Sequence, residues 1–195
     1  MSINSKYSVV ILAAGMSSRF GQTKAFLKWD SENTFLEKIC STYFESGISE
    51  GYIVVNDETY IELKKYPISK FHGFSIIINS FPEKGRLYSL KLAIEQMKSF
   101  NSCFIQNIDN PFVNINLISE LIKNMESNDY LVPNFNSQNG HPALISKNVL
   151  TKIANSDYNL GIKAVLNNFE KKILRIDDKS ILYNINTLDE YKSIF

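Results

Sequence analysis

The sequence predicts an α/β fold, in which a mostly parallel sheet lies between two layers of helices. Short apolar runs rich in β-branched residues alternate with segments of helical periodicity along the whole chain. Hydrophobic residues make up 44% of the 195 positions, which suits a chain that buries one core. No repeat or linker-like tract divides this pattern, so we expect residues 1–195 to form a single domain.

The first expected unit is a strand over Tyr7–Ala13, followed by a glycine- and serine-rich loop and a helix. The helix is expected to begin at a capping box, because Thr34 and Glu37 have the spacing at which each side chain satisfies a backbone N–H group of the other. Two further strands are expected at Tyr52–Val55 and Phe74–Ile78. Between them we expect a helix at Thr59–Tyr66, which the following proline ends.

In the middle of the chain, Ser89 is the expected N-cap of a helix whose apolar face carries Leu90, Ala93, Ile94 and Met97. A strand at Cys103–Ile108 and a helix at Ile115–Met125 follow. The last third is less regular. There we expect strands at Tyr130–Pro133, Pro142–Ile145, Ile173–Ile176 and Ile181–Ile185, a polar loop at Asn134–Gly140, and helices at Lys147–Ala154, Gly161–Phe169 and Leu188–Phe195.

Charge and cysteine content exclude several classes of protein. The net charge is +1 and no stripe of basic residues is present, so we expect no nucleic-acid partner. Cys40 and Cys103 lie in apolar segments and are expected to be core thiols in a reducing compartment. The apolar run at 7–14 is a strand rather than a signal-peptide core, because Arg19 and Lys24 follow it. No other run approaches the ~20 apolar residues of a membrane span, so we expect a cytoplasmic protein that does not bind a membrane.

The loop after the first strand, Leu12–Lys24, carries the strongest functional signal. In open α/β sheets, ligands bind at the carboxyl ends of the strands. Gly15 allows a sharp turn close to a ligand, and Arg19 and Lys24 supply cations that suit phosphates. The glycines fit neither the GxGxxG pattern nor the Walker A loop. An ordinary surface loop with two solvated cations is the alternative interpretation.

Four other places carry polar residues at expected strand ends or helix starts. Each also has a purely structural interpretation. Gly85–Leu90 could bind an anion or only cap a helix, and Asp109 could bind Mg2+ or only begin an Asx-Pro turn. The segment around Asn186 also forms a capping box, and His141 beside Pro142 is a residue type that is often simply packed.

The string Leu12–Lys24 resembles the signature LxAGxSxRxGxxK of the MobA-like nucleotidyltransferases, a group that includes the molybdenum-cofactor cytidylyl- and guanylyltransferases. Every fixed position of the signature is matched, by Leu12, Ala14, Gly15, Ser17, Arg19, Gly21 and Lys24. The resemblance covers about residues 7–192 and implies the Rossmann-like nucleotide-diphospho-sugar transferase fold. It also implies that this loop wraps a triphosphate, with nucleotide contacts from Leu12, Ala13, Ala14, Gly15, Ser17, Arg19 and Lys24.

The same resemblance assigns expected roles to the other motifs. Gly85 and Ser89 match a Gly-x-x-x-Ser-Leu element that lines the nucleotide pocket, and Asp109 matches the aspartate that holds the catalytic metal. Asn186 matches the second metal ligand, although Leu188 replaces the proline that usually follows. His141, in Gly-His-Pro, matches a position beside the acceptor pocket and is expected to bind substrate.

Together these features predict an Mg2+-dependent nucleotidyltransferase in which Arg19, Lys24 and Asp109 are the catalytic residues. An acceptor phosphate would attack the α-phosphorus of a nucleoside triphosphate and release pyrophosphate. We expect transfer of CMP ahead of GMP, from CTP or GTP to a phosphorylated small molecule such as molybdopterin. The alternatives are a sugar-phosphate or other metabolite nucleotidyltransferase, a nucleotide-binding module with weak or no catalysis, and a dinucleotide-dependent oxidoreductase, which the absence of GxGxxG disfavours.

Overall fold

A computed structural model describes residues 6–15, 23–98 and 101–195 of the chain. Within them, eight strands form one sheet in the order β3-β2-β1-β4-β7-β5-β6, with β8 paired to β5. The strands are β1 Tyr7–Ala13, β2 Glu50–Val55, β3 Ser75–Ile78, β4 Ser102–Asn107, β5 Tyr130–Phe135, β6 Gln138–Asn139, β7 Ala143–Ile145 and β8 Lys171–Arg175.

The sheet has a parallel half and a mixed half. Strands β1, β2, β3 and β4 are parallel to one another. Strand β7 runs antiparallel to both β4 and β5, whereas β8 is parallel to β5. The prediction of a mostly parallel sheet is therefore confirmed, with β7 and β6 as the antiparallel members.

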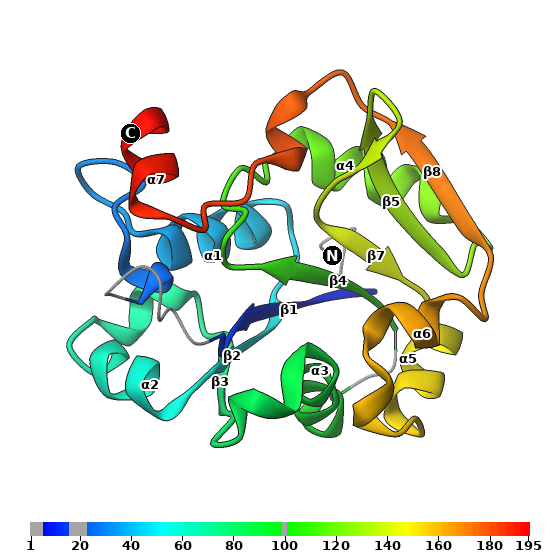
Figure 1. Cartoon of the computed structure of the whole chain (residues 1–195), viewed down its shortest axis with the longest axis horizontal. Coiled ribbons are helices and arrows are strands. Elements are labelled where there is room, and N and C mark those ends of the chain that lie inside the picture. The colour runs from blue at the N-terminus through cyan, green and yellow to red at the C-terminus, as the bar shows by residue number, and fades with distance from the viewer. Residues whose placement is uncertain (1–5, 16–22, 99–100) are drawn as a thin grey trace.

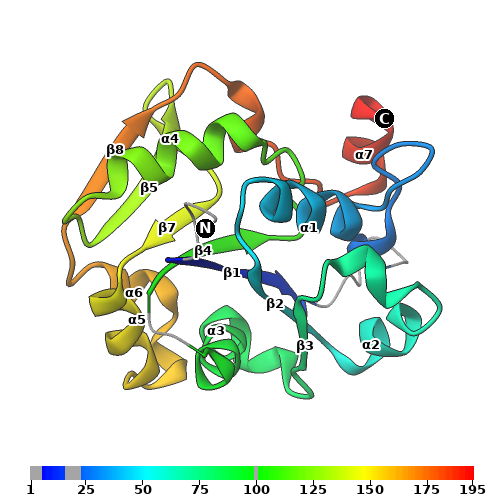
Figure 2. The same ribbon diagram turned by 180° about the vertical axis from the view of Figure 1, so that it is seen from behind.

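Helices cover both faces of the sheet, as Figures 1 and 2 show from opposite sides. Alternate residues of β1 face opposite ways: Val9 and Ile11 join the core under α1 (Phe35–Glu45) and α4 (Ile115–Met125). Val10 and Leu12 join the core on the other face. That face is covered by α3 (Gly85–Gln96), α5 (Lys147–Ala154) and α6 (Ile162–Leu166). The predicted three-layer architecture is confirmed.

The first helix begins as the sequence predicts. The Thr34 hydroxyl accepts from the Glu37 N–H at 3.3 Å, and the Thr34 N–H donates to the Glu37 carboxylate at 2.7 Å. This capping box satisfies donors that the first helical turn leaves without partners. Cys40 and Cys103 are free thiols and fully buried, as expected, and burial raises the pKa of both.

The expectation that Ser89 is an N-cap is wrong. Helix α3 begins at Gly85 with Lys84, five residues before Ser89, as its N-cap, directly after a 3-10 turn at Pro82–Lys84. The extra turn is helical because Leu87 is buried against the sheet. The Ser89 hydroxyl instead accepts a hydrogen bond of 2.9 Å from the Asn79 side chain, at the end of β3.

The expected strand at Ile181–Ile185 is also wrong, because a 3-10 turn, η5 (Lys179–Leu182), occupies its first half. The Asp178 side chain accepts from the Ser180 N–H and begins this turn. The apolar alternation that suggested a strand comes from Ile181 and Ile185, which are both buried anchors.

The segment expected as a polar loop, Asn134–Gly140, is a β-hairpin. Strand β5 extends to Phe135, which pairs with Gln138 of β6. Asn136 and Ser137 have φ values of 47° and 67°, which suit the tight turns that join antiparallel strands.

Helices α4 and α5 have the expected bounds, whereas three other helices are shorter than expected or begin elsewhere. Helix α2 spans Asp57–Leu63 behind its N-cap Asn56, α6 ends at Leu166, and α7 spans Leu188–Ile194. Among the helices of the described segments, none is long and apolar enough to cross a membrane.

Candidate active site

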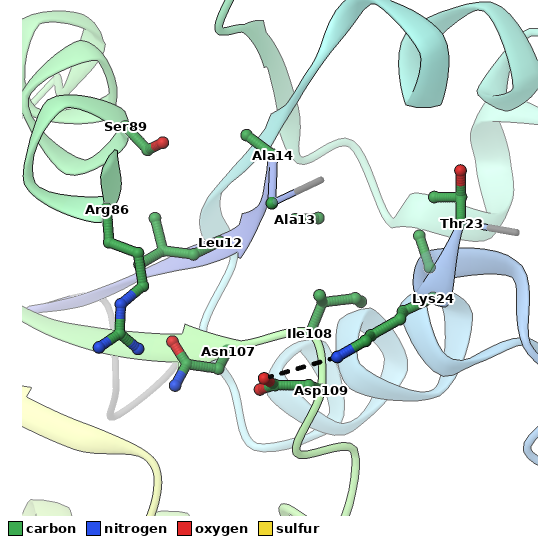
Figure 3. A pocket seen from close by; sticks show the side chains of 12 residues that line it. Leu12, Ala13, Ala14, Thr23, Lys24, Arg86, Ser89, Asn107, Ile108 and Asp109 are labelled. Carbon is green, nitrogen blue, oxygen red and sulfur yellow. Dashed lines mark ion pairs between the residues drawn. The ribbon is translucent and has the colours of Figure 1, made fainter. Parts of the chain in front are cut away.

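A pocket opens at the carboxyl ends of β1 and β4, where the parallel half of the sheet meets the start of α3 (Figure 3). Residues at the ends of β1 and β4, in the turn at residues 23–25 and at the start of α3 line this pocket. The lining residues are Leu12, Ala13, Ala14, Gly15, Thr23, Lys24, Ala25, Arg86, Ser89, Asn107, Ile108 and Asp109. Among the described residues, none would lie within 4 Å of a Cβ added at Gly15.

Three polar side chains converge at one end of this pocket. The Lys24 ammonium, from the 3-10 turn η1 (Lys24–Phe26), donates to Oδ1 of Asn186 at 2.9 Å. It also lies 4.0 Å from Oδ2 of Asp109, as the dashed line in Figure 3 shows. Two oxygen atoms from distant parts of the chain therefore face one cation.

The environment of Asp109 fits a metal ligand. Its second oxygen, Oδ1, is buried and has no hydrogen-bond partner among the described residues. A buried carboxylate oxygen without a donor is costly unless a cation or water satisfies it. The described segments hold no cluster of three His, Cys, Asp or Glu side chains that could bind a metal. Mg2+ does not need one, since it commonly takes one or two protein oxygens and completes its shell with phosphates and water.

Asn186 is held in place from the C-terminal side. Its N–H donates to the Glu190 carboxylate at 2.6 Å, and the same carboxylate accepts from the Thr187 N–H at 3.0 Å in the capping box of α7. These hydrogen bonds lower the pKa of Glu190, so the carboxylate stays charged at neutral pH.

The lining residues Arg86 and Asn107 were not among the site residues predicted from the sequence. Arg86 is exposed, and no ion pair or hydrogen bond engages its guanidinium within the described ranges. Figure 3 shows it extending from α3 toward Asn107, the last residue of β4. The signal that could have revealed Arg86 is its place directly after Gly85, at the start of a helix whose N–H groups suit an anion.

His141 lies in a second cleft, which shares Arg86 and Asn107 with the pocket. Gly140 allows this placement: a Cβ there would lie 2.6 Å from the Ile181 carbonyl oxygen. The His141 ring approaches the Asn107 side-chain nitrogen at 3.2 Å. Burial lowers the pKa of His141, and the Asp109 carboxylate partly offsets this by favouring the protonated form.

Both basic and apolar residues line this second cleft. Arg86, Lys163 and Lys171 line it, and no Asp or Glu is among its described lining residues. Its apolar lining residues are Ile105, Tyr130, Val132, Ala143, Ile162 and Leu166. An anionic ligand with an apolar body would fit these walls.

The structure thus brings most of the predicted site residues together. Lys24, Asp109, Ser89 and residues 12–15 line the pocket, Asn186 contacts Lys24, and His141 lines the adjoining cleft. Gly85 begins α3 beside the pocket without lining it. Ser17, Arg19 and Gly21 lie outside the described residues.

Comparison with known proteins shows which family the chain resembles in sequence. Residues 9–174 match the model of the MobA-like NTP transferase domain. A probable molybdenum cofactor guanylyltransferase of Clostridium perfringens (strain 13) is 28% identical, with 97% of this chain and 96% of the relative covered. The molybdenum cofactor cytidylyltransferase of Escherichia coli K12 is 26% identical, with 93% and 92% covered.

The fold has close counterparts among solved structures. The crystal structure of Rv0371c from Mycobacterium tuberculosis superposes with a TM-score of 0.84 at 18% identity, with 97% of each chain covered. That protein has also been solved as a complex with manganese.

Proposed function

Because the chain belongs to the MobA-like NTP transferase family and is a nucleotidyltransferase, we propose that it moves CMP or GMP to a phosphorylated small molecule such as molybdopterin, with Mg2+ as cofactor. The observation that carries the proposal is the convergence of Lys24, Asp109 and Asn186 at the pocket between β1 and β4. CTP is the favoured donor, and GTP is the alternative.

In the proposed reaction, an oxygen of the acceptor phosphate forms a bond to the α-phosphorus of the triphosphate. The bond from the α-phosphorus to the oxygen that bridges to the β-phosphorus breaks, and pyrophosphate leaves with that electron pair. Lys24 would contact the phosphates and neutralise the charge that develops on them. Arg19, five residues before Lys24 in the sequence, would bind the triphosphate by forked hydrogen bonds. No covalent intermediate with the protein is required, because positioning and charge neutralisation account for most catalysis of phosphate transfer.

Asp109 and Asn186 would hold the metal. When bound, Mg2+ would act as a Lewis acid that neutralises phosphate charge and helps to orient donor and acceptor. An asparagine oxygen is neutral and a weaker ligand than a carboxylate. This favours, as the second candidate function, a nucleotide-binding module with little catalysis.

The second cleft would bind the acceptor. Its three cations suit the acceptor phosphate, and its apolar lining residues suit a flat organic body. His141 contacts Asn107, which both clefts share. Since burial lowers the pKa of His141, its ring is a neutral hydrogen-bonding group at pH 7 rather than another cation.

The proposal is tested by pyrophosphate release with CTP or GTP and either molybdopterin or a sugar phosphate as acceptor. We expect Lys171→Ala to raise the KM for the acceptor at least fivefold and to leave the KM for the triphosphate unchanged. The matched control is Lys123→Ala, since Lys123 is an exposed lysine of α4 outside both clefts. Triphosphate binding without pyrophosphate release with any acceptor would favour the binding module instead.

A further inference from the structure

Asn110, the residue after Asp109, joins the two segments that carry the proposed metal ligands. Its side chain is fully buried, and Nδ2 donates to the Ile181 carbonyl at 3.1 Å and to the Tyr183 carbonyl at 2.7 Å. Two carbonyl acceptors fix which end of the amide carries the nitrogen. Oδ1 is buried and has no partner in the described part of the chain, so the side chain acts here only as a donor.

The turn that carries Asn110 is itself fixed to the core. Gln106, fully buried in β4, donates from Nε2 to the Asn110 carbonyl at 2.8 Å. Its Oε1 accepts from the hydroxyl of buried Tyr43 in α1 at 3.0 Å. The Asn110 side chain therefore extends from a rigid base.

Only a few other hydrogen bonds position the segment that Asn110 holds: the His141 N–H donates to the Ile181 carbonyl at 3.0 Å, and Lys24 and Glu190 bind Asn186 near the end of the segment. Residues 181–186 belong to no strand, and in Figure 1 the chain here passes from orange to red beside the end of β4. The Ile185 N–H donates to the Asp109 carbonyl at 2.7 Å. The buried side chains of Ile181 and Ile185 attach the segment by hydrophobic contact, which is not directional. Hydrogen bonds are directional and so fix its position.

We propose that Asn110 is a positioning residue, which holds the segment carrying Asn186 against the turn carrying Asp109 and thereby sets the geometry of the two metal ligands. The inference rests on the proposed function, because it assumes that both residues bind the metal. It adds that the amide donor of Asn110, and not only the two ligands, determines the affinity for metal.

The test uses two substitutions that remove the donor. Asn110→Asp keeps the shape of the side chain but places carboxylate oxygens against the two carbonyls. Asn110→Ser has a side chain too short to reach these carbonyls, and it introduces no buried charge. The matched control is Asn128→Asp. Asn128 also donates from Nδ2 to two backbone carbonyls, those of Asn124 and Met125, but does so at the end of α4.

The first readout is the affinity for Mn2+, which is measured by electron paramagnetic resonance in the presence of CTP and, separately, of GTP. We expect both Asn110 variants to bind Mn2+ at least fivefold more weakly and Asn128→Asp to bind it as the wild type does. Nucleotide affinity in EDTA should change less than twofold. Hydrogen exchange of residues 183–187 should be faster in Asn110→Ser, which reports the loosened segment without metal.

The outcomes separate the two claims. If Mn2+ binds Asp109→Ala as tightly as the wild type, the metal site is wrong, and the positioning role falls with it. If binding depends on Asp109 but both folded Asn110 variants match the wild type, only the positioning role is overturned. A loss of binding equal to that of Asn128→Asp would overturn it as well, because the effect would then be general destabilisation.

Discussion

Replacing Lys24 with methionine should have opposite effects on metal binding and on catalysis. The Lys24 ammonium lies 4.0 Å from Asp109 and donates to Asn186, so it lies beside the position that we propose for the metal. A metal that binds before the nucleotide would be repelled by this ammonium. Once a triphosphate is bound, its oxygens can accept the ammonium, and the repulsion is relieved.

The size of this effect follows from the distance. Unit charges 4 Å apart interact by about 1 kcal/mol in bulk water, so an ammonium repels a dication at that distance by about 2 kcal/mol. The lysine side chain can move partly away, which leaves roughly 1.4 kcal/mol, or about a tenfold change in the dissociation constant. Lys24→Met should therefore bind Mn2+ about tenfold more tightly than the wild type when nucleotide is absent. Its turnover should fall at least tenfold, because the cation that contacts the phosphates is missing.

Electron paramagnetic resonance of Mn2+ measures the first effect, and pyrophosphate release measures the second. Lys24→Arg keeps the charge and serves as the control for the binding measurement. Unchanged or weaker Mn2+ binding in Lys24→Met would show that the ammonium does not repel the metal, and near-wild-type turnover would remove Lys24 from its proposed role.

Three further predictions concern catalysis, pH and stability. Asp109→Ala should cut turnover at least tenfold with an unchanged circular dichroism spectrum, and a rate near that of the wild type would contradict its role as a ligand. Burial lowers the pKa of His141 below 6.5, so the unfolded chain binds the proton more readily. The melting temperature should accordingly fall as the pH drops below about 6.5, and it should fall less in His141→Gln than in the wild type. The same pH profile of the melting temperature in both proteins would contradict this prediction. Thr34→Ala removes the cap of α1 and should lower the free energy of unfolding in urea by roughly 1 kcal/mol, without changing the KM for nucleotide; an unchanged urea midpoint would contradict this.

Local rules were enough to predict most of the fold. The strand at Tyr7–Ala13 and the helices at 35–45, 115–125 and 147–154 agree with the structure, because their apolar periodicity and caps are properties of neighbouring residues. The expectation for Ile181–Ile185 failed because the hydrogen bonds of this segment go to His141, Asp109 and Asn110, which are distant in the sequence.

The candidate site likewise contains residues that local motifs predict and residues that only the fold brings together. Lys24 and Asp109 stand at the ends of recognisable motifs, and their convergence follows from their places after parallel strands. Lys163 and Lys171 have no local pattern that marks them. They reach the second cleft only because α6 and β8 pack around the mixed half of the sheet.

The most direct test of the central claim is calorimetric binding of CTP, GTP, UTP, ATP and NAD, each with and without Mg2+, to the wild type and to Asp109→Ala. We expect one triphosphate, CTP ahead of GTP, to bind selectively and more tightly with Mg2+, and the substitution to remove the contribution of the metal. Binding that is indifferent to both Mg2+ and Asp109, or no triphosphate binding at all, would contradict the central claim.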